Sequence, residues 1–204
     1  MKTLLRHAAS TTFLLTAVGS AQAQATPNLE TSRSEVALHY TATRGNSPPG
    51  SCGCFYLQGA ALEAALPLSR SFSATLEVAG NHAGLVPSTA RALSTITLMA
   101  GVRYTRTFGL RSEPFVQGLA GAVRGFDAAF PQSSGTNDTA DTATGLALAL
   151  GGGYAFRLTR AVTLLPVQVD FVQTNLPNGV DGRQRNLRFS TGVRFHVGFG
   201  LSRR

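Results

Sequence analysis

The feature that most constrains the fold of this chain is an alternation of apolar and polar residues, which recurs from Glu35 to Phe199. Successive side chains of a β-strand point to opposite faces, so this alternation predicts strands that are apolar on one face only. Eight segments follow the pattern: 35–44, 55–66, 71–80, 93–106, 113–125, 142–156, 161–174 and 186–199. We therefore predict an all-β fold of eight antiparallel strands.

Short and long connections alternate between these segments. The short connections are 67–70, 107–112 and 157–160. The long connections are 45–54, 81–92, 126–141 and 175–185, and they are rich in the Gly, Pro, Asn, Asp and Ser that loops favour. In an up-and-down arrangement all short turns lie at one end and all long loops at the other, which is typical of a transmembrane β-barrel with periplasmic turns and extracellular loops.

The two faces of the predicted strands differ in bulk and charge. In the last segment Leu187, Phe189 and Phe195 share one face, whereas Arg188 and Arg194 share the other. In the seventh segment the apolar face holds Leu165, Val167, Val169 and Phe171. A soluble lipocalin-like barrel, the alternative, would turn its bulky face inward. Here the charges share their face with Gly and Ala, which suits a narrow interior, so we expect the bulky face to meet lipid.

Six charged residues fall on the narrow face and form the candidate site. They are Glu63, Glu77, Arg103, Asp170, Arg188 and Arg194. A charge removed from water needs a partner, and breaking such a pair costs about 3–5 kcal/mol. The main hypothesis is a structural charge network that plugs the lumen, because a barrel of eight strands has room for side chains but not for a water channel. A proton or ion pathway along these charges is the alternative.

Other chemistry finds little support in the sequence, and we expect no catalytic residues, no cofactor and no metal site. His39, His82 and His196 lack the spacing of metal ligands. Ser94 and His39 could be considered parts of a Ser/His/acid hydrolase site near one rim, but no G-x-S-x-G motif accompanies them. The glycine run 151–153 does not precede a phosphate-binding helix and indicates close backbone packing.

The composition and the first residues indicate export. Only 14% of residues are charged, against roughly 25% in ordinary soluble proteins. Lys2 and Arg6 precede an apolar run, 11–18, and a small-residue site that allows cleavage after Ala23 or Ala25. We expect a signal peptide over 1–25, a linker over 26–34 and a barrel over 35–204. The net charge of +8 comes from dispersed arginines, not from a clustered patch, which argues against nucleic acid as a partner.

Two cysteines, Cys52 and Cys54, lie in the first long connection. An oxidising compartment makes a disulfide between them the main hypothesis, although so short a loop is strained. Free thiols are the alternative. Either state would affect only the tip of a loop.

With these segments laid out, the chain resembles the bacterial outer-membrane β-barrel domain family, the small eight-stranded proteins of the OmpA and OmpX type. The resemblance rests on Met99-Ala-Gly-Val-Arg-Tyr104, Leu148-Ala-Leu-Gly-Gly-Gly-Tyr154 and the stretch from Leu187 to Phe195. It implies a Gram-negative outer membrane, contact with its lipid, and recognition by the insertion machinery through Phe195 or Phe199.

The resemblance and the patterning together favour a non-enzymatic, monomeric surface protein. Its long loops would contact an unidentified ligand or support adhesion, with the polar stretch from Pro131 to Thr139 as the main candidate. A narrow passive pore is one alternative. An enzyme that modifies lipid A or phospholipid is another.

Overall fold

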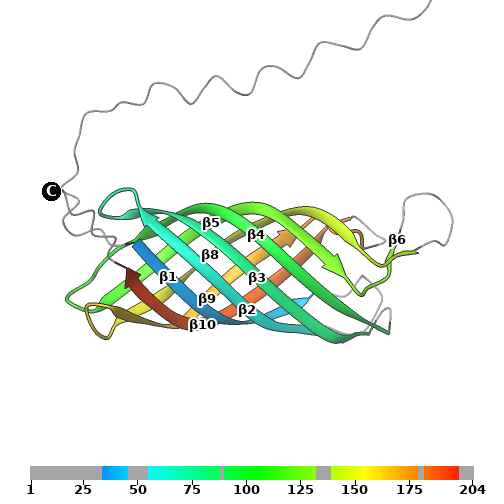
Figure 1. The fold of residues 1–204 in the computed structure, drawn as a ribbon, viewed down its shortest axis with the longest axis horizontal. Helices are drawn as coiled ribbons and strands as arrows, with labels where there is room; N and C mark the ends of the chain where they lie inside the picture. Colours follow the sequence, from blue (N-terminus) through cyan, green and yellow to red (C-terminus); the bar gives the residue numbers. More distant parts are fainter. Residues whose placement is uncertain (1–33, 46–54, 88–89, 132–138, 179–181, 198–204) are drawn as a thin grey trace, which may run out of the picture. The chain divides into compact units, whose positions relative to one another are not determined.

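The protein forms one closed antiparallel barrel in the computed structural model, which describes residues 34–45, 55–87, 90–131, 139–178 and 182–197 (Figure 1). The barrel strands are β1 (Ser34–Gly45), β2 (Phe55–Pro67), β3 (Phe72–Val86), β4 (Arg91–Thr105), β5 (Ser112–Phe126), β8 (Ala143–Arg157), β9 (Val162–Thr174) and β10 (Gln184–Val197). Two short strands, β6 (Phe130–Pro131) and β7 (Thr139–Ala140), pair within a long connection. The predicted eight-stranded up-and-down barrel is confirmed. Within the described ranges, no helix is long and apolar enough to cross a membrane.

The barrel closes through its first and last strands. Each strand pairs with its neighbour along the chain, and β1 pairs with β10 from Ser34 opposite Val197 to Arg44 opposite Leu187. Closure leaves no strand with an unpaired edge, so the backbone hydrogen bonds of the wall are all made within the sheet.

The wall is apolar outside and polar inside. Leu187, Phe189 and Phe195 are exposed on the exterior, whereas Arg188 and Arg194 are buried in the interior. The same alternation runs along the other strands, so large apolar side chains cover the outside of the sheet. This is the inside-out arrangement expected of a wall that faces lipid.

The third strand is longer than its alternation predicts. It continues past Gly80 to Val86, so His82, which we expected in a loop, lies within β3 opposite Ser94 of β4. Polar residues interrupt the apolar pattern here, but the backbone pairing with β4 continues. The predicted loop over 126–141 likewise contains the small β6–β7 pair.

The prediction that Leu165 lies on the apolar exterior is wrong, because β9 contains a bulge. Leu165 is opposite Gly192, but Gln168 is opposite Ser190, so two residues of β9 face one of β10. Pro166 lies within the bulge, between Leu165 and Gln168. Its missing N–H is tolerated because the hydrogen-bonded pairing of the two strands is interrupted there. The bulge shifts the alternation and turns Leu165 into the interior, where it packs in a cluster with Phe115 and Ala155.

A larger apolar cluster fills the interior toward the long loops. It includes Leu57, Leu93 and Val123 from the strands, together with Phe130 and Leu176 from the connections that leave them. Both loop residues are buried. Side chains from the long connections thus pack over the end of the barrel that they surround.

Candidate functional site

Arg188 of β10 crosses the interior to reach carboxylates on two other strands. Its Nη1 and Nη2 donate to Glu77 Oε1 and Oε2 of β3 at 2.7 and 3.0 Å. Nη2 also donates to Asp170 Oδ2 of the adjacent strand β9 at 3.0 Å. Because β1 and β2 separate β3 from β10 around the barrel, the bond to Glu77 spans the lumen.

Arg103 of β4 organises a second group. Its Nη1 donates to Glu63 Oε1 of β2 at 2.6 Å, and its Nη2 contacts the second oxygen of the same carboxylate. This is the two-pronged geometry that a planar guanidinium favours. Nε of Arg103 also donates to Gln117 Oε1 of β5, at 3.1 Å.

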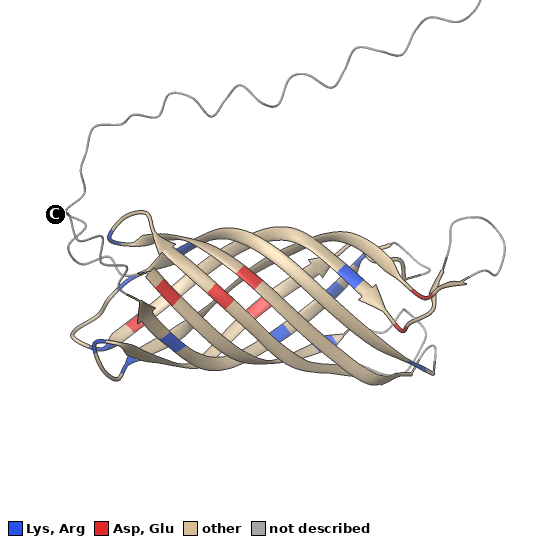
Figure 2. Ribbon diagram, in the orientation of Figure 1, with Lys and Arg blue, Asp and Glu red and all other residues tan. Residues whose placement is uncertain are grey.

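Gln117 joins the two groups into one network. Its Nε2 donates to Asp170 Oδ1 at 3.2 Å, while Arg188 binds the other oxygen of that carboxylate. The resulting chain runs through Glu63, Arg103, Gln117, Asp170, Arg188 and Glu77, and draws on strands β2, β4, β5, β9, β10 and β3. All six side chains are buried. Figure 2 shows several of the acidic positions on the strands of the barrel wall.

Arg194 lies apart from this network, although it occupies the same face. Its Nε is 3.3 Å from Glu35 Oε2 of β1, and its guanidinium lies 5.5 Å from the centre of the Phe115 ring. Arg103 stacks on the same ring at 4.6 Å. Sequence reasoning did not single out Glu35, nor Glu113, which pairs with Arg157 beside it on the next strand.

Gln117 was also missed, and the signal that could have identified it is its position. It lies on the inward side of β5 between Phe115 and Leu119, the only amide among larger apolar neighbours there. A neutral side chain does not draw attention in a count of charges. Yet an amide both donates and accepts, so it can link an arginine to a carboxylate.

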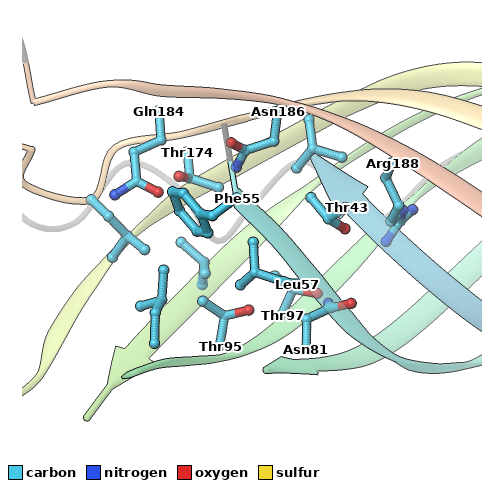
Figure 3. Close-up of a pocket in the computed structure, with 14 residues that line it drawn as sticks. Thr43, Phe55, Leu57, Asn81, Thr95, Thr97, Thr174, Gln184, Asn186 and Arg188 are labelled. Carbon is cyan, nitrogen blue, oxygen red and sulfur yellow. The ribbon is translucent and has the colours of Figure 1, made fainter. Parts of the chain in front are cut away.

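A small cavity lies beyond Arg188, toward the long loops (Figure 3). It has a volume of about 40 Å³, enough for one or two water molecules. Its lining is mixed: Thr43, Thr95, Thr97 and Asn186 contribute polar groups, while Phe55 and Leu57 contribute apolar ones. A cavity of this volume is too small for a metabolite.

Neither a protein-family model nor a curated protein sequence matches this chain. Solved structures do. Neisserial surface protein A (NspA) superposes with a TM-score of 0.59 at 17% identity, over 80% of this chain and 97% of NspA. Ail, the attachment invasion locus protein of Yersinia pestis, superposes with a TM-score of 0.55 at 15% identity, over 80% of this chain and 97% of Ail.

The chain has the fold of the small eight-stranded outer-membrane barrels. The resemblance inferred from the strand motifs is confirmed at the level of the fold. An outer-membrane location follows from this fold together with the apolar exterior. Contact with membrane lipid follows in turn.

The outer-membrane barrel does not bring together the pair considered for catalysis. His39 is buried in the interior beside Glu63, whereas Ser94 lies near the long-loop rim. Ser94 instead contacts His82 Nδ1 at 2.9 Å and donates to Asp127 Oδ2 at 2.9 Å. In a catalytic triad the histidine stands between serine and acid; here the serine stands between the other two, so no acid orients the imidazole as a base.

Some predicted features lie outside the described residues: the signal peptide, the linker up to residue 33, Cys52, Cys54, residues 132–138 of the candidate contact loop, and Phe199. Within the described ranges, no three His, Cys, Asp or Glu side chains are grouped to hold a metal ion.

Proposed function

We propose that this protein is a non-enzymatic, non-conducting barrel of the outer membrane, with a lumen closed by its own side chains and long loops that present a contact surface. The observation that carries this proposal is the network from Glu63 to Glu77. Its ion pairs cross the interior instead of lining one wall, so they occupy the path that an ion would take.

The pairing of charges within the network supports the same conclusion. Glu63 faces Arg103, while Glu77 and Asp170 share Arg188, and each carboxylate accepts hydrogen bonds from a guanidinium. An ion entering this layer would have to displace a bonded partner in a region without bulk water, which is costly. The apolar cluster around Phe130 and Leu176 adds a second closure toward the long loops.

Planar-bilayer recording tests the closed lumen. We expect purified wild-type protein, folded and inserted, to show no stepwise conductance. The double variant Glu77→Ala with Arg188→Ala removes the pair that spans the lumen. On a background of Phe130→Ala and Leu176→Ala, which opens the apolar closure, it should produce conductance if it remains folded. Arg124→Ala, on the outer wall, is the matched control and should stay silent.

Steady conductance through the wild-type protein would contradict the closed lumen and favour the passive pore. If the double variant fails to fold, the wild-type recording still decides the question. Activity of the wild-type protein on lipid A or phospholipid in detergent micelles would contradict the non-enzymatic role.

The contact surface is proposed on the long loops because arginines gather at that rim. Arg124 and Arg185 are exposed there, as is Arg91, which pairs with Asp141 Oδ1 at 3.2 Å. Ail has been solved in complex with the heparin analogue sucrose octasulfate, and that structure superposes with a TM-score of 0.53 at 15% identity, over 80% of this chain and 97% of Ail. We expect sucrose octasulfate to bind this protein in calorimetry and to bind more weakly to Arg124→Gln with Arg185→Gln. Absence of binding would remove a polyanion as the ligand.

We further propose that residues 1–25 are a signal peptide and that 26–34 link it to the barrel over 35–204. We also propose that insertion machinery recognises the chain during biogenesis. The folded protein is proposed to be a monomer. Sequencing the amino terminus of the membrane form tests the first point. We expect it to begin at Gln24 or Thr26. Mass measurement with and without reductant tests the disulfide between Cys52 and Cys54.

A further inference from the structure

The three short turns share a composition that the strands do not. Each combines at least one arginine with at least one exposed large apolar side chain. The turn between β2 and β3 has Leu68 and Arg70, that between β4 and β5 has Arg106, Phe108, Leu110 and Arg111, and that between β8 and β9 has Leu158 and Arg160. We call Arg70, Arg106, Arg111 and Arg160 the basic girdle. All four are exposed, and Figure 2 shows basic positions on these turns.

The apolar members of the turns are unusually open. Leu110 is 90% exposed, and Leu68, Phe108 and Leu158 are each at least half exposed. Short turns projecting into water normally carry polar residues, and repeated exposed apolar side chains indicate a contact surface. Arg106 holds its guanidinium 5.0 Å from the centre of the Phe108 ring, so charge and apolar surface are presented side by side.

No acid in the turns offsets the charge of the girdle. Residues 68–71, 106–111 and 158–161 include no Asp or Glu. The acids nearest to this end of the barrel, Glu35 and Glu113, face inward and pair with Arg194 and Arg157. The girdle therefore presents positive charge to whatever lies against this rim, and an anionic partner complements it.

The surface next to the turns is continuous with the lipid-facing wall. Phe72 and Tyr104 form an exposed aromatic pair on the exterior, with ring centres 5.1 Å apart, directly beside the turns. Aromatic residues at this level are typical of the interface between hydrocarbon and headgroups. A soluble protein partner would have to bind outside this interface. Lipid headgroups, in contrast, surround a membrane barrel at this level.

We propose that the short-turn rim binds the phosphate headgroups of anionic phospholipids in the adjoining leaflet. The arginines of the girdle donate to phosphate oxygens, for which a planar guanidinium is well suited. Leu68, Leu110 and Leu158 enter the interfacial region beside them. With the short turns facing the periplasm, the ligand belongs to the inner leaflet of the outer membrane.

Lipid selectivity in reconstituted membranes tests this proposal. The protein is inserted into phosphatidylcholine vesicles, and spin-labelled phosphatidylglycerol is compared with spin-labelled phosphatidylcholine in the motionally restricted shell. We expect the wild-type barrel to prefer phosphatidylglycerol several-fold at low salt. The fourfold variant Arg70→Gln, Arg106→Gln, Arg111→Gln and Arg160→Gln should lose most of that preference. Heat-dependent electrophoretic migration verifies that each variant is folded.

The matched control is Arg44→Gln, which removes an exposed arginine near the opposite rim that is not among those proposed to bind a polyanion. This control should keep the preference. The proposal is overturned if the wild-type protein shows no preference, if the fourfold variant retains it, or if the control loses it. Binding of soluble poly-glutamate without a preference for phosphatidylglycerol would also overturn it and would indicate an acidic protein partner.

If the fourfold variant fails to fold, the single variants Arg106→Gln and Arg160→Gln are measured instead, and each should reduce the preference in part. The conductance of the wild-type protein does not depend on this rim. Failure of the lipid test would therefore not contradict the proposal of a closed lumen. Conductance through the wild-type barrel would likewise not contradict the proposed lipid site.

Discussion

At the scale of single residues, Arg188 shows why arginine serves this interior. One guanidinium binds Glu77 with two nitrogens and still reaches Asp170. Lysine would present one compact ammonium group and could not satisfy both carboxylates in this fixed geometry. Because both acids are buried, an acid that loses its partner cannot turn toward bulk water.

Replacing Arg188 should therefore be costly. In Arg188→Gln two buried carboxylates lose their cation, and we expect the free energy of unfolding to fall by about 3–5 kcal/mol. Urea titration in detergent micelles measures this change. Arg124→Gln, on the exposed wall, should change stability by no more than about 0.5 kcal/mol. Equal stability of Arg188→Gln and wild type would show that the network does not stabilise the barrel.

What the sequence could predict at this scale was the face of each strand on which a residue lies, but not its partner. Alternation fixes the face because side chains point in opposite directions along a strand. It says nothing about which residue stands across the lumen, because that depends on strand tilt and register. The link through Gln117 and the separate pairing of Arg194 with Glu35 could not be predicted for this reason.

At the scale of strands, Gly151 lies where β8 and β9 approach each other closely. A Cβ atom at this position would lie 2.3 Å from Asp170 Oδ1 and 2.3 Å from Val169 O. Both distances are too short for non-bonded atoms. The expectation that the glycine run reflects close backbone packing agrees with this geometry.

Gly151→Ala should thus disturb both the backbone packing against Val169 and the side chain of Asp170, a member of the charge network. We expect a loss of about 1–3 kcal/mol, the usual cost of overpacking. Gly80→Ala is the control, because a Cβ there meets nothing within 4 Å. The folded fraction after refolding and the urea midpoint report the difference. A Gly151→Ala barrel as stable as Gly80→Ala would contradict the crowding.

The strand boundaries and the bulge show where alternation stops being informative. The bulge at Pro166 adds one residue and reverses the faces on either side of it, so a continuous pattern misplaced Leu165. Backbone pairing also extends β3 past Gly80, where Asn81 and His82 interrupt the apolar pattern. Hydrogen bonds of the ladder do not depend on side-chain polarity, so alternation underestimates a strand that leaves the membrane.

At the scale of the whole molecule, strand number, direction and fold class were all predictable, because each follows from the same alternation and from the order of short and long connections. The inside-out arrangement was predictable too, since charges share their face with small residues. It can be tested directly, because the chain contains no tryptophan.

We expect a single tryptophan to report the two faces. Phe171→Trp places it on the exterior, and Phe115→Trp places it in the interior. In vesicles of lipids brominated along the acyl chain, the fluorescence of Phe171→Trp should be strongly quenched and that of Phe115→Trp should be little affected. The two variants change the same residue type, so each serves as the control of the other. Equal quenching would contradict the inside-out wall.

The bonding of β1 to β10 joins the two ends of the barrel segment and has a consequence for biogenesis. A chain that lacks its final strand leaves two strand edges unpaired. The backbone N–H and C=O groups of these edges find no hydrogen-bond partner in hydrocarbon. Partial products therefore gain nothing from entering the bilayer one hairpin at a time. Unassisted insertion is therefore expected only after the whole barrel segment, including its last strand, has been exported.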